Sequence, residues 1–178
     1  QMEFRPTFTL SGDRQVVDDF GADIVDHSGN TVIFTTDENP KISHSLWLPS
    51  VSNGSRLVLA NDRLARITPG GGTLIAAIQI GYFLGIRKFV LYGVDHNFNF
   101  KKEQDAEDEF RSASGDENHF IKGYRSGKSW CPPAMQLIED SFSYADEMLR
   151  QEGGFLVNAT RGGKLEVLER VELEDAIQ

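Results

Sequence analysis

The clearest hydrophobic pattern lies in the middle of the chain. Residues 74–84 are apolar on nearly every side, which predicts a buried helix, and Gly85 is placed to end it. The run Lys88–Val94 is continuously apolar, as is typical of a central parallel strand covered on both faces. Together they predict one half of a βαβ crossover, with Asp95 and His96 at the carboxyl end of the strand.

Weaker patterns on either side complete the predicted elements. The expected strands or alternating segments are 4–10, 32–36, 45–48, 56–59, 155–157 and 165–170, and the expected helices are 13–20, 132–151 and 173–177. Strands that alternate with helices predict one α/β domain over residues 1–178, with a mostly parallel sheet flanked by helices. The charged stretch 101–117 predicts a mobile loop or lid.

Composition narrows the class of protein. Hydrophobic residues make up 39% and charged residues 25%, as in a globular domain, and the net charge of −9 argues against nucleic acid and anionic membranes as partners. No apolar run approaches the roughly 20 residues of a membrane span. The single cysteine, Cys131, excludes an intramolecular disulfide, and the chain starts without a signal-like layout. Both observations favour a cytoplasmic protein.

A glycine loop is the first candidate binding segment. Gly70-Gly71-Gly72-Thr73 precedes the central helix, so the amides of Gly71, Gly72 and Thr73 and the helix dipole suit a phosphate. The alternative is a tight turn in which Thr73 is the N-cap of the helix. The loop matches neither the Walker nor the dinucleotide fingerprint.

Polar residues after two predicted strands form the second candidate segment. Ligands of parallel sheets bind outside the carboxyl ends of the strands, and Asp95-His96 lies there, where a carboxylate can hold a ribose hydroxyl, a metal or a proton. Asp95 could instead cap the next loop. Asn158 and Thr160 follow another short strand and predict a further rim of the site. For Gly162-Gly163-Lys164 a hairpin turn is favoured over a phosphate loop.

The third candidate segment surrounds His119. Imidazole is the natural general base near neutral pH, although a lone histidine is also common in structural positions. Arg125 and Lys128 follow, and they either neutralise a phosphate or are solvated. No Cys/His set has structural zinc spacing, so no metal site is predicted.

These residues resemble the 6-hydroxymethylpterin diphosphokinase MptE-like domain family. The matching stretches are Gly72-Thr73 with its helix, 85–96, 118–120 and 158–167, and 4–13 is similar to the family's second strand and following helix. The resemblance implies a Rossmann-like α/β fold, similar to that of bacterial sialyltransferases that use CMP-sugars. It also implies that this chain lacks the family's first strand and its glycine-rich turn.

The resemblance implies a transferase with a nucleotide or nucleotide-sugar donor and a small hydroxyl acceptor. The leading hypothesis is a sialyltransferase-like glycosyltransferase of surface-glycan synthesis with His119 and Asp95 as catalytic residues, although Tyr124 is a closer family counterpart of the base. In this hypothesis His96 positions the donor, and Arg125 or Lys128 offsets the charge of the leaving group. One alternative is a pterin-type pyrophosphokinase that needs ATP and Mg²⁺. The other is a non-catalytic assembly domain that forms homo-oligomers.

Overall fold

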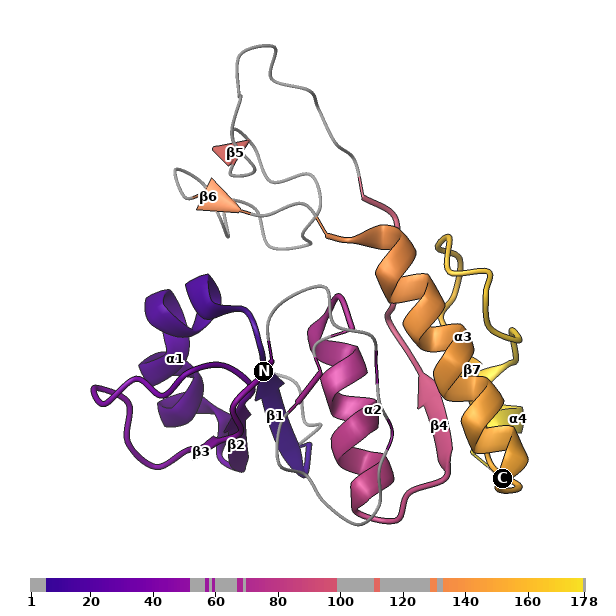
Figure 1. Cartoon of the computed structure of the whole chain (residues 1–178), viewed down its shortest axis with the longest axis horizontal. Helices are drawn as coiled ribbons and strands as arrows, with labels where there is room; N and C mark the ends of the chain where they lie inside the picture. The colour runs from indigo at the N-terminus through magenta and orange to yellow at the C-terminus, as the bar shows by residue number, and fades with distance from the viewer. Residues whose placement is uncertain are drawn as a thin grey trace. The chain divides into compact units, whose positions relative to one another are not determined.

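The computed structural model describes residues 6–51, 57, 59, 67–68, 70–98 and 133–177, and the backbone alone of 111–112 and 129–130 (Figure 1). Its contacts divide the chain into two compact units, Gln1–Phe89 with Met135–Leu156 and Val90–Ala134 with Val157–Gln178. The single domain expected from the sequence stays a prediction. The helices are α1 (Arg14–Ser28), α2 (Thr73–Phe83), α3 (Met135–Gln151) and α4 (Leu173–Ala176). The strands are β1 (Phe8–Ser11), β2 (Thr31–Phe34), β3 (Leu46–Trp47), β4 (Lys88–Leu91), β5 (Arg111–Ser112), β6 (Ser129–Trp130) and β7 (Phe155–Asn158).

The first unit is built on a parallel sheet of order β1-β2-β3 (Figure 1). Successive side chains of a strand point to opposite faces. Phe34 accordingly packs with Val17 of α1, whereas Ile33 packs with Ala76 and Ile80 of α2. Helices therefore cover both faces of the sheet. This confirms the mixed α/β class, and the arrangement is compatible with a Rossmann-like fold.

Helix α1 is longer than the sequence predicts. Asp13 begins it as N-cap by accepting hydrogen bonds from the amides of Gln15 and Val16, as the turn signal suggested. The predicted end at residue 20 is wrong because Gly21 does not break the helix. Gly21 is buried against Ile42, where a Cβ would lie 2.5 Å from the Ile42 Cδ1. The helix ends instead at Gly29, whose φ of 64° is left-handed.

The central crossover is confirmed in part. Helix α2 ends as expected, because Gly85 has a φ of 90° and its amide bonds to the Tyr82 carbonyl. Strand β4 stops at Leu91, three residues before the predicted end. Full coverage of both faces was wrong for this strand, because Lys88 and the following Tyr92 are exposed. Within the described residues β4 pairs only with β7.

The second unit holds the chain after β7 and the antiparallel pair β5–β6. The expected alternating segment at 165–170 forms no strand and has one isolated bridge, from Asn158 to Arg170. The buried residues of this segment are Leu165 and Leu168, three positions apart, and Val167 is exposed, so burial does not follow the period of two that a strand requires. Most of the predicted lid at 101–117 and of the strand at 56–59 lies outside the described residues. In the described part of the chain no helix is long and apolar enough to cross a membrane.

Candidate functional site

Small polar side chains gather at the carboxyl end of the parallel sheet in the first unit. Ser11 ends β1, and Thr35 and Thr36 follow β2, and all three are buried. The amide of Thr35 donates to the carbonyl of Ser11 at 2.9 Å, so the two strand ends remain paired beyond β2. This is the edge at which parallel α/β sheets bind their ligands.

Gly12 joins this edge to the glycine loop. Its amide donates to the Thr73 Oγ1 at 3.2 Å, and a Cβ on Gly12 would lie 2.5 Å from the Thr35 Oγ1. Only glycine fits there without a shift of its neighbours. Sequence reasoning missed Ser11, Gly12 and Thr35. The signal that could have found them is a run of small polar residues directly after each β-branched strand.

The N-terminus of α2 carries no side-chain cap. The N-cap is Gly72, so the alternative of Thr73 as N-cap is wrong, because the Thr73 hydroxyl accepts from Gly12 instead. Within the described chain the amides of Thr73 and Leu74 have no acceptor. In α1, by contrast, the Asp13 side chain accepts from the second and third amides of the helix, those of Gln15 and Val16. Free amides and the helix dipole make this end electropositive.

A buried hydroxyl lies against the same loop. Ser141 of α3 is 3% exposed, and its Oγ has no hydrogen-bond partner among the residues that the structure describes. A Cβ on Gly70 would lie 2.8 Å from that Oγ, and Gly70 has a left-handed φ of 51°. A buried polar atom normally finds a partner. The Ser141 Oγ therefore lies against the glycine loop without the partner that a buried hydroxyl normally has.

In the second unit, Asp95 and His96 have different environments. Asp95 is exposed, whereas His96 is buried and left-handed, with a φ of 47°. The His96 ring meets the Phe98 ring edge-on at 6.2 Å between centroids. A non-glycine residue held in this backbone region is strained, and such strain clusters at functional sites.

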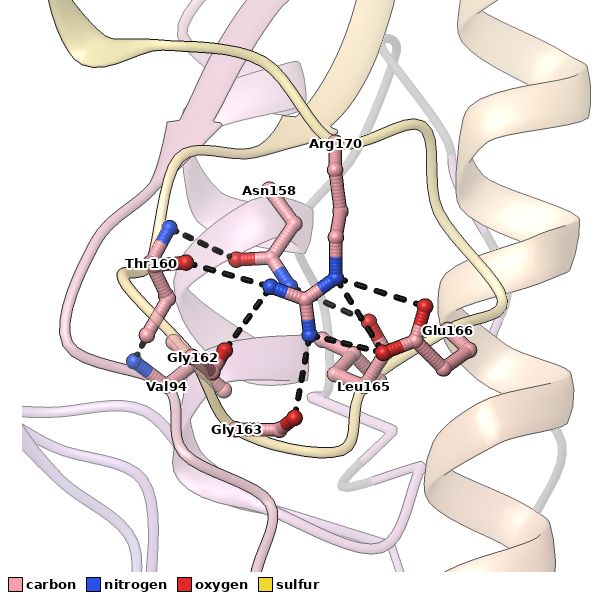
Figure 2. Close-up of polar contacts among 8 residues, drawn as sticks. All are labelled: Val94, Asn158, Thr160, Gly162, Gly163, Leu165, Glu166 and Arg170. Carbon is pink, nitrogen blue, oxygen red and sulfur yellow. Dashed lines mark hydrogen bonds and ion pairs between the residues drawn. The ribbon is translucent and has the colours of Figure 1, made fainter.

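The structure brings Val94, which directly precedes Asp95, together with the predicted rim of Asn158 and Thr160 (Figure 2). The amide of Val94 donates to the Thr160 Oγ1 at 2.9 Å, and the amide of Lys164 donates to the Asp95 carbonyl at 2.7 Å. The Asn158 side chain accepts from the Thr160 amide and donates to the Leu165 carbonyl. Residues at the ends of β4 and β7 are therefore close together, whereas their role in binding stays a prediction.

The hairpin expected at Gly162-Gly163-Lys164 is wrong. No strand follows these residues, and Arg170 reaches back over them instead. Its guanidinium donates to the carbonyls of Thr160 (3.1 Å), Gly162 (2.8 Å) and Gly163 (3.3 Å). A brace to three carbonyls holds the chain in an open loop, which needs no partner strand.

The third predicted segment, with His119, Tyr124, Arg125 and Lys128, lies outside the described residues, as does Cys131. Among the residues that are described, no three His, Cys, Asp or Glu side chains group to hold a metal ion. Comparisons with protein-family models, curated proteins and solved structures found no match. The two clusters of polar residues therefore have to be interpreted from their own chemistry.

Proposed function

We propose that this chain is a nucleotide-dependent transferase of Rossmann-like fold that holds a donor phosphate at the N-terminus of α2. The observation that carries the proposal is the uncapped helix start, where the amides of Thr73 and Leu74 have no acceptor in the described chain. The Ser141 hydroxyl, which has no partner among the described residues, is buried against Gly70 and adds a polar group to the wall of the same loop. A phosphate oxygen at the helix start would accept from the free amides.

The donor class that we favour is a nucleotide-sugar in surface-glycan synthesis, with transfer of the sugar to a hydroxyl acceptor in the cytoplasm. Two features support this choice. The family resemblance of the glycine loop and of 85–96 implies it, and small hydroxyl residues at the carboxyl edge can hydrogen-bond polar donor groups. In this proposal His119 removes the acceptor proton, and an inert His119→Ala enzyme is the expected result.

Gly72 offers the sharpest test of the phosphate site. Its backbone is extended, with φ −173°, and a Cβ there would meet only the Ile138 Cδ1 at 4.0 Å, so either alanine or aspartate fits. Gly72→Asp supplies an N-cap carboxylate that accepts from the Leu74 amide, as Asp13 does from the Gln15 amide in α1, and places a negative charge beside the Thr73 amide. It should keep or slightly raise the thermal midpoint, because a cap contributes a few tenths of a kcal/mol over glycine. It should also weaken donor binding at least about tenfold by charge repulsion.

Gly72→Ala is the matched control and should bind like the natural chain. Each variant is titrated with CMP, CMP-sugar, UDP-sugar, GDP-sugar and ATP, with and without Mg²⁺, and binding is measured by calorimetry. Binding of a nucleotide-sugar that is lost only in Gly72→Asp is the expected result. Binding of ATP only with Mg²⁺ would favour the pyrophosphokinase alternative. Equal affinity in Gly72→Asp and Gly72→Ala would exclude the helix end as the phosphate site.

A further inference from the structure

The loop after β7 exposes two cations in an otherwise acidic chain. Arg161 and Lys164 flank Gly162 and Gly163, and both side chains are exposed. Neither side chain has an ion-pair or hydrogen-bond partner in the part of the chain that the structure describes. The chain carries 27 acidic and 18 basic residues, and these two cations form a locally positive segment within it.

Arg170 fixes the direction of the peptide groups in this loop. Its guanidinium gathers the carbonyls of Thr160, Gly162 and Gly163, and the Glu166 carboxylate binds the same guanidinium at 2.9 Å (Figure 2). In a trans peptide the N–H points opposite to the preceding C=O. The amides of Arg161, Gly163 and Lys164 therefore point away from Arg170.

One of these three amides is already used, and two are not. The Lys164 amide donates to the Asp95 carbonyl, while those of Arg161 and Gly163 have no acceptor within the described residues. Both glycines are left-handed, with φ of 72° and 80°, which lets the loop turn its amides outward. The two unused amides and the two side-chain cations belong to one short loop and can therefore bind the same anion, as in other backbone anion sites.

We propose that the loop Thr160–Lys164 is a second anion-binding site, which takes a phosphate or pyrophosphate group. Arg161 and Lys164 neutralise the anion, and the amides of Arg161 and Gly163 donate to its oxygens. Arg170 is a positioning residue that holds the loop in its binding shape and does not touch the anion. All these residues belong to the second unit, so the site stands independently of the proposed phosphate site at α2.

The probe is inorganic pyrophosphate, and orthophosphate is titrated separately. Binding is detected by two-dimensional amide NMR of the whole chain. In the natural sequence the Arg161, Gly162 and Gly163 resonances should shift in a saturable manner. In the double variant Arg161→Gln/Lys164→Gln the dissociation constant read from these resonances should rise at least about tenfold, since each charge-assisted contact is strong. Both side chains are exposed and unpaired in the described chain, so this variant should keep its thermal midpoint.

Arg170→Gln tests the positioning of the loop separately from the charge that Arg161 and Lys164 supply to the anion. Arg150→Gln is its matched control. Arg150 also pairs with a carboxylate four residues away, Asp146 at 2.7 Å, but it lies on helix α3 and not in the loop after β7. In Arg170→Gln the Gly162 and Gly163 resonances should move before any ligand is added, and pyrophosphate affinity should fall by a similar factor. Arg150→Gln should leave both readings unchanged.

Three results would overturn the proposal. The first is the absence of a saturable shift at Gly162 and Gly163 up to millimolar pyrophosphate. The second is an unchanged dissociation constant in the double variant, which would mean nonspecific ion association. The third, undisturbed loop resonances and full affinity in Arg170→Gln, would remove the positioning role. Gly72→Asp must not change these readings, so failure here is distinguishable from failure of the phosphate site at α2.

Discussion

At the scale of single residues, Asn158 determines the shape of the loop that follows β7. It is 1% exposed, and its side chain uses both its oxygen and its amide, to the Thr160 amide and the Leu165 carbonyl. Asn158→Ala leaves two buried backbone groups without partners. We expect a loss of roughly 2–4 kcal/mol in the free energy of unfolding, measured by urea denaturation.

Asn39→Ala is the control for Asn158. The Asn39 side chain also both donates and accepts, to Asp18 and from Lys41, but these bonds are exposed to solvent. Water replaces them, so the loss should stay below about 1 kcal/mol. Equal losses in the two variants would contradict the role given to the buried Asn158 bonds.

The two loop glycines form a natural pair for a second residue-scale prediction. Both are left-handed, but a Cβ on Gly163 would lie 2.6 Å from the Asp95 carbonyl oxygen, and one on Gly162 would meet nothing within 4 Å. Gly162→Ala should therefore cost only the left-handed strain of about 1–2 kcal/mol. Gly163→Ala should cost clearly more, because it also forces the Lys164–Asp95 bond apart. Urea denaturation of both variants measures the difference, and equal costs would contradict it.

At the scale of elements, a polar cluster ties the ends of α2 and α3 to the start of β4. The Tyr82 hydroxyl and the Arg87 Nε both donate to the Glu152 carboxylate. The bond from Tyr82, then that from Arg87, lowers the pKa of Glu152 below its ordinary 4.5. The same bond to Glu152 raises the pKa of Tyr82 above its ordinary 10.0. The cluster is thus strongest between these two ordinary values.

The pH dependence of stability follows from these directions. A carboxyl group with a lowered folded-state pKa stabilises the fold above its unfolded pKa, and that stability is lost as pH falls through the folded value. The natural chain should therefore exceed Glu152→Gln in urea midpoint near pH 7, and the gap should narrow below pH 4.5. The control is Glu147→Gln, which changes an exposed glutamate of α3, the helix that ends just before Glu152, and it should show no such gap. A gap independent of pH would contradict the account.

Elements also show what the sequence could and could not predict. Helix α2, its end at Gly85 and the helix α3 were predictable because local hydrophobic periodicity and glycine chemistry decide them. The length of α1 was not, because the fit of Gly21 against Ile42 is a tertiary contact. The hairpin expected at 162–164 failed for the same reason. A guanidinium that binds three carbonyls leaves no local pattern in the sequence.

At the scale of the whole molecule, the candidate site was predictable to the level of strand ends. Polar residues that follow strands were expected to meet at one edge, and Val94, next to Asp95, does bond to Thr160, while the Asp95 carbonyl bonds to the Lys164 amide. Gly12, Thr35 and Ser141 were not found, because only packing shows that they adjoin the glycine loop. The net charge of −9 gave no indication of the cationic pair, since a total charge does not report local clusters.

The brace of Arg170 has a consequence for how this part of the chain folds. Its carbonyl bonds and the Asn158–Leu165 bond span sequence separations of only 7 to 10 residues. The loop-closure entropy of such short contacts is small, and contacts of low order form early. By contrast, the bond from Val94 to Thr160 spans 66 residues. The loop can thus reach its shape from local contacts alone. The end of β4 then binds to a loop that is already formed.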